Sequence, residues 1–144
     1  MKNINYFRII PLLIILMTGV LSSCKKDKDI IAPDAATAIA GQYGYSELTY
    51  NGKTLPANQT DLKGSVTLNR QTSTQVEISL DIRMKSSNSE FLVGSLDDVE
   101  VADKGDGNYS LSYEGEEFAQ IKGKKLTFKG EDVDGVPFTI GATK

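Results

Sequence analysis

Three clusters of acidic residues come closest, by residue type and spacing, to catalytic chemistry in this sequence. Two carboxyl groups that face each other across a sugar, about 5–10 Å apart, can hydrolyse a glycosidic bond. All three clusters lie near predicted turns, where carboxylates are usually solvated loop charges. We therefore expect solvated charge, and no enzyme activity, from Asp97-Asp98-x-Glu100, Glu114-x-Glu116-Glu117 and Glu131-Asp132-x-Asp134.

The residue types that are missing restrict the chemistry further. The chain has no His, no Trp and one Cys. A His-bearing catalytic triad, a Cys/His zinc site and a disulfide within the chain are therefore excluded. The segment 103–108 (DKGDGN) superficially resembles a calcium loop, but it lacks the alternating ligand spacing and the bidentate Glu. We expect a plain hairpin turn there, and neither a metal nor a cofactor.

Aromatic residues are the better candidates for function, because they supply apolar area and, in tyrosine, a hydroxyl group for a bound molecule. The alternative is that they only fill a core. Large apolar side chains are numerous enough to pack most of a small barrel, so we expect a shallow cavity at most. The candidate ligand-binding residues are Tyr43, Tyr45, Tyr109, Tyr113, Phe128 and Phe138.

Strands must position these residues, because side chains alternate between apolar and polar over long stretches. The clearest case is 75–85 (QVEISLDIRMK), whose alternation predicts one buried and one solvated face. Asp34 is placed to cap a short helix before the first strand. We expect eight strands, at 41–50, 62–71, 75–85, 91–103, 108–114, 117–122, 125–133 and 136–142.

Short turns join these strands. Asp134-Gly135 is typical of a two-residue hairpin loop, Gly123-Lys124 predicts another, and 105–108 closes a third connection. Asn51-Gly52 bends the chain after the first strand, and 91–103 is expected to contain a bulge near Asp97-Asp98. Local turns imply antiparallel pairing throughout. The fold class is therefore all-β, an up-and-down meander that closes, or nearly closes, into a small barrel, with a β-sandwich as the alternative.

The N-terminus has the pattern of an export signal. Lys2 and Arg8 precede an apolar run over 9–20, which is shorter than the roughly 20 residues that a spanning helix needs. Leu21-Ser22-Ser23-Cys24 looks like the bacterial lipobox. We therefore expect a cleaved signal peptide at 1–23, a lipid on Cys24, a polar tether and short helix at 24–40, and a barrel domain at 41–144. The alternative is an ordinary signal peptide with an incidental cysteine.

Three stretches of the barrel domain carry a family resemblance. Ala40-Gly41-Gln42-Tyr43, 99–111 (VEVADKGDGNYSL) and 121–128 (IKGKKLTF) resemble calycin-like (lipocalin-like) lipoprotein domains of Bacteroidota. The resemblance implies an eight-stranded barrel whose open end takes a small apolar ligand. Tyr43 stands where lipocalins have the Trp that plugs the barrel floor.

The expected location is the outer membrane, on its periplasmic side or at the cell surface. The charged run 25–29 (KKDKD) resembles the surface-export tags of such lipoproteins, although it also fits a solvated tether, and Lys25 in place of Asp favours the outer membrane. A net charge of −3 without a basic stripe argues against nucleic acid as a partner.

Two functions follow from these patterns. The first is a membrane-tethered, non-enzymatic binding module for a small apolar ligand. The second is an envelope-structural or inhibitory lipoprotein with a filled barrel, which contacts a protein partner through an outer face or through loops such as 54–61.

Overall fold

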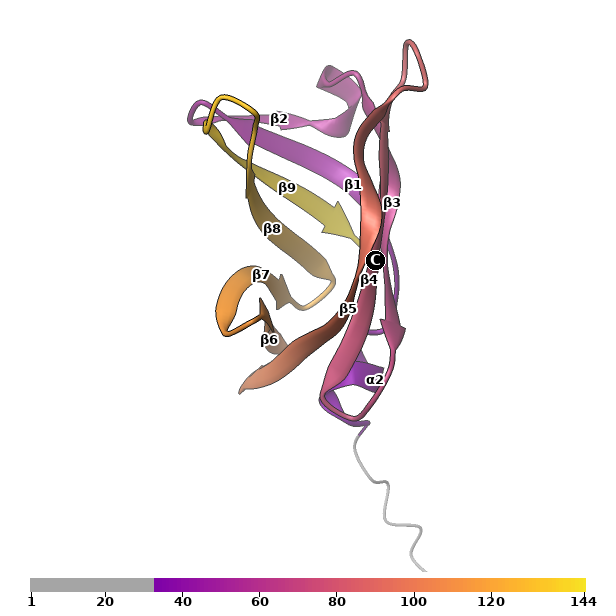
Figure 1. Ribbon diagram of the computed structural model, residues 1–144, viewed down its shortest axis with the longest axis vertical. Coiled ribbons are helices and arrows are strands. Elements are labelled where there is room, and N and C mark those ends of the chain that lie inside the picture. The colour runs from indigo at the N-terminus through magenta and orange to yellow at the C-terminus, as the bar shows by residue number, and fades with distance from the viewer. Residues whose placement is uncertain (1–32) are drawn as a thin grey trace, which may run out of the picture. The chain divides into compact units, whose positions relative to one another are not determined.

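The computed structural model describes residues 33–144 (Figure 1). The predicted signal peptide 1–23, the lipidated Cys24 and the tether to residue 32 lie outside the described residues, so their roles stay predictions. Within 33–144, no helix has the length and apolar character needed to cross a membrane.

The chain folds as one continuous antiparallel sheet with a short helix at its start. Each strand pairs with the next along the sequence, as the short turns predicted. The elements are α2 (Ala35–Ile39), β1 (Gly41–Tyr50), β2 (Lys53–Pro56), the 3-10 helix η3 (Ala57–Gln59), β3 (Leu62–Arg70), β4 (Gln75–Met84), β5 (Glu90–Gly105), β6 (Asn108–Tyr113), β7 (Glu116–Lys122), β8 (Lys125–Glu131) and β9 (Pro137–Thr143).

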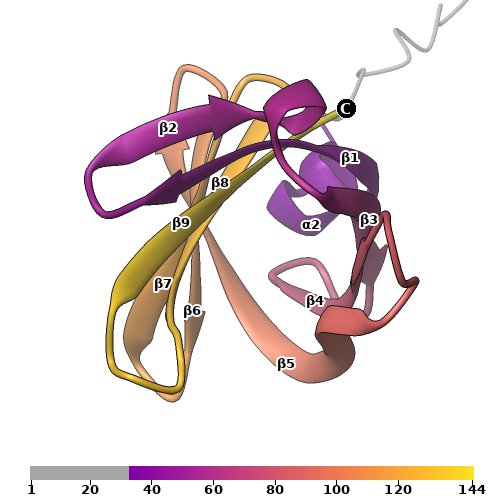
Figure 2. The ribbon, with the colours of Figure 1, turned by 90° about the horizontal axis from the view of Figure 1, so that it is seen from above.

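The sheet closes on itself because β1 also pairs with β9. This ladder runs from the pair Gly44 and Thr143 to the pair Tyr50 and Phe138. The ring of strands β1 and β3–β9 is a closed eight-stranded barrel, and β2 is an additional strand beside the second half of β1 (Figure 2). The predicted barrel is confirmed over the sandwich. Closure of the ring removes most of the open edges that would otherwise invite aggregation.

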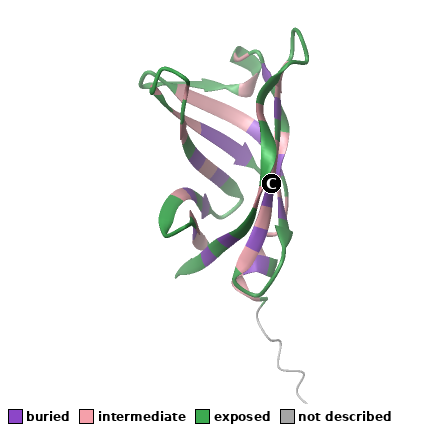
Figure 3. Cartoon of the chain, viewed as in Figure 1, coloured by how far each residue is buried: buried purple, intermediate pink, exposed green. Residues whose placement is uncertain are grey.

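The helix α2 lies at the lower end of the barrel (Figures 1 and 2). Asp34 caps it as predicted, since its side chain accepts a hydrogen bond from the Thr37 amide at 2.8 Å. Ala36 and Ile39 are completely buried, and the Tyr43 hydroxyl donates to the Ile39 carbonyl at 2.8 Å. This end of the barrel is therefore filled, and buried positions gather towards it while the upper loops are exposed (Figure 3).

The wall of the barrel is uneven, because neighbouring strands differ greatly in length. β5 has 16 residues and β6 has six, so β6 pairs only with Glu100–Gly105. The upper part of β5, from Glu90 to Asp98, pairs with β4 alone. On the other side, β7 pairs with β8 only as far as Phe128. A segment of the upper wall between β5 and β8 is consequently open (Figure 1).

Two details of the strands correct the sequence-based expectation. β2 was not predicted as a strand; all four of its residues are exposed, so it has no burial pattern to reveal it. The β8–β9 loop also has three residues and not two. Asp132 pairs with Val136 through a backbone hydrogen bond, and its Oδ1 accepts from the Asp134 amide at 2.9 Å, which fixes a turn with Gly135 after it. Gly135 has a positive φ, whereas Asp134 does not need one.

The other predicted irregularity is confirmed. β5 has an extra residue at Asp97-Asp98, where Val76 and Ile78 of β4 pair with Val99 and Leu96. Such a bulge bends a strand and increases its twist.

Candidate functional site

The upper half of the barrel encloses a cavity of about 280 Å³. Its walls come from β3, β4 and β5 on one side and from β7, β8 and β9 on the other. The lining consists almost wholly of apolar side chains, with two charged residues on β8. These residues are Val66, Ile78, Leu80, Leu92, Leu96, Phe118, Ala119, Leu126, Phe128, Lys129, Gly130, Glu131 and Phe138.

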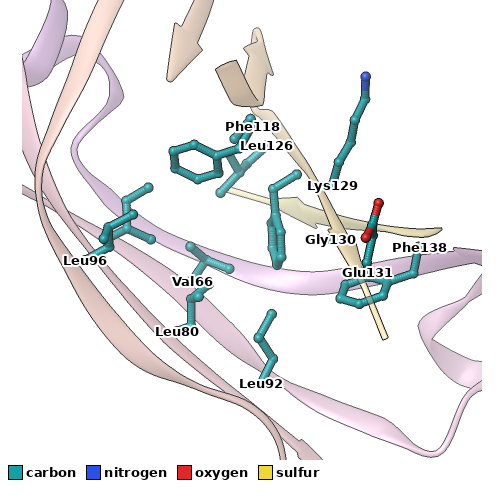
Figure 4. A pocket seen from close by; sticks show the side chains of 13 residues that line it. Val66, Leu80, Leu92, Leu96, Phe118, Leu126, Lys129, Gly130, Glu131 and Phe138 are labelled. Atoms are coloured by element: carbon teal, nitrogen blue, oxygen red, sulfur yellow. The ribbon is translucent and has the colours of Figure 1, made fainter. Parts of the chain in front are cut away.

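Figure 4 shows the two walls facing each other. Leu80, Leu92 and Leu96 project from β4 and β5, and Phe118 and Phe138 lie across from them. Alternation places them there, because Leu80, Leu92 and Leu96 all lie on the face that β4 and β5 turn inward. The site is thus a gap between two apolar walls, and the lower core fills the barrel beneath it.

Two glycines lie on the inner face next to residues that line the cavity. Gly94 lies between Leu92 and Leu96, opposite Leu80 in the regular part of the β4–β5 ladder. A Cβ at Gly94 would have no heavy atom within 4 Å, so this position leaves open space where the neighbouring residues place leucines. On the other wall, a Cβ at Gly130 would lie 2.6 Å from the Phe138 ring. The absence of a side chain there gives the end of the Phe138 ring room to lie against β8.

Bulges direct two further aromatic rings. One extra residue, Phe91, stands in β5 where Ile82 and Arg83 of β4 pair with Leu92 and Glu90. Phe118 has the same position in β7 opposite β6. Bulges often re-aim a side chain next to a binding site. Here they bring Phe91 to the Phe138 ring, with centroids 6.0 Å apart and planes tilted by 55°, and they turn Phe118 to the cavity.

The polar groups of the site lie at its edge. Lys129 and Glu131 are exposed and lie on the part of β8 that pairs with β9 but not with β7, and the Lys129 ammonium group points away from the leucine wall (Figure 4). Neither side chain has an ion-pair partner within the part of the chain that the structure describes. Across residues 33–144 no group of three or more acidic or sulfur-bearing side chains is arranged to hold a metal ion. The cavity offers apolar contact inside and charge only at its rim.

The six residues predicted to bind a ligand separate into two groups. Phe128 and Phe138 line the cavity. The four tyrosines do not, which corrects the expectation that they share one lining with the phenylalanines.

Each tyrosine has a different position. Tyr43 is part of the filled floor, where burial raises the pKa of its phenol, and Tyr45 is buried with its hydroxyl 2.9 Å from that of Thr60. Tyr109 is half-buried against the core and borders a hollow lined mainly by polar residues of β6 and β7, and Tyr113 is exposed beside the β6–β7 turn.

Sequence reasoning did not single out the aliphatic half of the site. Leu80 was expected on the buried face of 75–85, whereas no role was predicted for Leu92 and Leu96 within the strand 91–103. The signal that identifies them is the length of β5 relative to β6, which leaves one edge of the upper part of β5 without a neighbouring strand.

The acidic clusters are located as expected for solvated charge. The carboxylates at 97, 98 and 100 and those at 114, 116 and 117 are exposed. Asp132 differs, since it is half-buried and accepts three hydrogen bonds, from the Tyr50 hydroxyl at 2.9 Å and from the amides of Asp134 and Val136. The segment 103–108 forms the expected hairpin turn, with Gly105 paired to Asn108.

Comparison with known proteins adds two structural likenesses. No family model matches the chain, and no curated protein matches it. A redesigned β-barrel, mFAP1, bound to DFHBI is 16% identical over 77% of this chain and 99% of its own, with a TM-score of 0.44. A second barrel, a de novo designed fluorescence-activating one, is 14% identical over 77% of this chain and 97% of its own, with a TM-score of 0.45. We base the function below on the chain's own cavity and not on these likenesses.

Proposed function

We propose that this barrel is a non-enzymatic binding module for a small apolar ligand. The observation that carries the proposal is the cavity of about 280 Å³, whose lining is apolar apart from Lys129 and Glu131 at the edge. Pockets that bind small molecules are usually apolar concavities of about 300–1,000 Å³ with a few polar groups. This cavity is slightly smaller than that range, so it fits only a compact ligand.

The volume sets the size of the ligand. A cavity of about 150 Å³ holds benzene, which gives about 25 Å³ for each carbon atom. By that measure, 280 Å³ accommodates about eleven non-hydrogen atoms. At about 0.5–0.6 kcal/mol for each atom, such a ligand binds with about −6 kcal/mol, a Kd of about 40 µM.

A neutral fluorophore of that size tests the proposal. We would titrate residues 25–144 with 1-aminonaphthalene, whose emission shifts to the blue and brightens in an apolar site. We expect saturable binding at one site for each chain, with a Kd in the tens of micromolar. Leu96→Asn places an amide in the lining and should weaken binding at least tenfold, because the apolar probe cannot satisfy that group. The matched control is Ser95→Asn, on the outer face of the same strand. Titration without saturation would contradict the proposal.

We also propose that Cys24 carries the lipid that holds the barrel on the outer membrane. The support is the sequence pattern around Leu21-Ser22-Ser23-Cys24. An anchor of several acyl chains is stable because each buried methylene contributes about 0.8 kcal/mol. Fractionation of cells tests this proposal: the wild-type chain should partition with outer membranes and Cys24→Ser should not. Labelling with an alkyne fatty acid should mark the wild-type chain alone, and equal labelling of both chains would contradict it.

The resemblance to calycin-like lipoprotein domains of Bacteroidota agrees with both proposals and remains a prediction. A stoichiometric protein partner recovered from outer membranes, together with no probe binding, would instead favour the envelope-structural function.

A further inference from the structure

A second hollow lies at the upper mouth of the barrel, next to the cavity. It measures about 290 Å³ and is lined by Leu48, Tyr50, Phe91, Asp132 and Phe138. Phe138 lines both hollows, so the two lie on either side of, or along, one aromatic ring. Three of the five lining residues are aromatic and one is an acid. The proposed apolar ligand does not account for that composition.

The three rings are held in place by the fold. Tyr50 and Phe138 are opposite each other in the β1–β9 ladder, so both side chains lie on the inner face. The bulge in β5 brings Phe91 to Phe138, with ring centroids 6.0 Å apart. Tyr50 and Phe91 remain 38% and 41% exposed, although both are large apolar residues. The mouth therefore presents aromatic surface that no side chain of the barrel covers.

Asp132 is the charged group of this hollow, and its carboxylate is fixed. Its Oδ1 accepts from the Val136 amide at 2.8 Å and from the Asp134 amide at 2.9 Å, and its Oδ2 accepts from the Tyr50 hydroxyl at 2.9 Å. The backbone hydrogen bond from Val136, followed by that from Tyr50, lowers the pKa of Asp132 below its ordinary value. The carboxylate is thus negatively charged at neutral pH. Lys53 is opposite Tyr50 in the β1–β2 ladder, but it is exposed and outside the lining.

Aromatic rings around a fixed anion are suited to an organic cation. A cation over a ring face is attracted by the ring quadrupole, and cages of aromatic side chains bind quaternary ammonium groups in this way. A carboxylate has about four lone-pair sites, and three of those of Asp132 are already in use. A quaternary ammonium group requires no hydrogen bond, so it fits this hollow better than a primary amine or a guanidinium group does.

We propose that the mouth hollow binds the quaternary ammonium head of an amphiphile whose apolar body enters the neighbouring cavity. The position of the body rests on the proposed function, whereas the position of the head rests on Tyr50, Phe91, Phe138 and Asp132. The ligand is then a small cationic amphiphile, and Phe138 contacts both of its parts.

The test compares a cation with its uncharged carbon isostere. Benzyltrimethylammonium and neopentylbenzene have the same shape and differ in charge, and the binding of each is measured directly by isothermal titration calorimetry. Asp132→Asn removes the charge and keeps an oxygen that accepts from the amides of Asp134 and Val136, so the turn is retained. Asp134→Asn is the matched control, because Asp134 is exposed on the same loop and outside the lining. Circular dichroism and the thermal midpoint check that each variant is folded.

We expect Asp132→Asn to weaken binding of the cation about fivefold or more while the isostere changes less than twofold. Asp134→Asn should change neither ligand more than twofold. Phe91→Leu keeps apolar volume and removes a ring, so it should also weaken the cation more than the isostere. A cation whose affinity is the same in wild type and Asp132→Asn would overturn the inference.

The outcomes separate the two proposals. If the isostere binds and the cation does not, the ammonium site is wrong and the apolar cavity stands. If the cation binds and depends on Asp132, but neither the isostere nor 1-aminonaphthalene binds, the mouth hollow acts alone and the proposed function is wrong. If neither molecule binds, both proposals fail.

Discussion

Filling the cavity from Gly94 is the most direct way to separate ligand binding from folding. Gly94→Leu adds four carbon atoms, about 100 Å³ at about 25 Å³ for each carbon. This side chain points to the face that Leu92 and Leu96 occupy, where the glycine leaves open space. The backbone at Gly94 has no positive φ, so a leucine fits there without strain. Roughly a third of the 280 Å³ is lost.

The effect on binding follows from the contacts that the ligand loses. Four carbon atoms at about 0.8 kcal/mol each amount to about 3 kcal/mol, a roughly hundredfold loss of affinity. The fold should be unaffected or stabilised, because glycine in a strand interior costs about 0.5–1 kcal/mol relative to a residue with a side chain. We therefore expect binding of 1-aminonaphthalene to become undetectable while the urea midpoint stays the same or rises.

Ser95→Leu is the control for this experiment. Ser95 is the next residue in β5, on the opposite, exposed face, so the substitution adds a leucine to the same strand without entering the cavity. Its affinity for the fluorophore should match wild type within twofold. The reasoning is refuted if Gly94→Leu is folded and binds as wild type does, or if Ser95→Leu loses as much affinity.

Three further substitutions test interactions that stabilise the barrel, one beside the site and two at its lower end. Gly130→Ala forces the Phe138 ring to move, because the new Cβ would lie 2.6 Å from it; we expect a loss of about 1–3 kcal/mol in urea unfolding. Tyr43→Phe leaves the carbonyl at the end of α2 without its 2.8 Å hydrogen bond and should cost about 1 kcal/mol by the same assay. The hydrogen bond and charge of Arg70 hold the pKa of Asp34 below its usual value. That stabilisation is present above about pH 4 and is lost as the pH falls through the folded pKa, so the gap in urea midpoint between wild type and Asp34→Asn should close in acid.

The alternation of apolar and polar residues was sufficient to predict the barrel, because its strands have one buried apolar face. In β4, Val76, Ile78 and Ile82 are at most 3% exposed, as their spacing predicted. The turns could also be predicted from the sequence, since Gly123 and the pair at 106–107 have the positive φ values that their hairpins require. β2 was missed for the same physical reason, because a strand with no buried face has no periodic pattern.

The site was harder to predict because alternation gives the face of a residue and not its height in the barrel. Tyr43 and Phe138 both point inward, yet Tyr43 lies in the filled floor and Phe138 lines the cavity. The position of a residue along the barrel axis depends on the register of its ladder and on the relative lengths of neighbouring strands. Both are known only once the pairing partners of each strand are known. The bulge that brings Phe91 to Phe138 is likewise a mismatch between two strands, and neither strand reveals it alone.

The cavity is large enough to cost the fold a substantial part of its stability, so the needs of folding alone do not explain why the space is left open. Empty volume in a protein interior costs about 24 cal/mol for each Å³, so 280 Å³ corresponds to at most about 7 kcal/mol, less where the space opens to water. Domains of this size are stable by only about 5–15 kcal/mol. One side chain at Gly94 would recover part of that cost without backbone strain, since nothing lies within 4 Å of its Cβ position. A barrel whose role were only to be a rigid scaffold gains nothing from leaving this space open. A barrel that takes a ligand between Leu80, Leu92 and Phe138 recovers the lost contacts when the ligand binds.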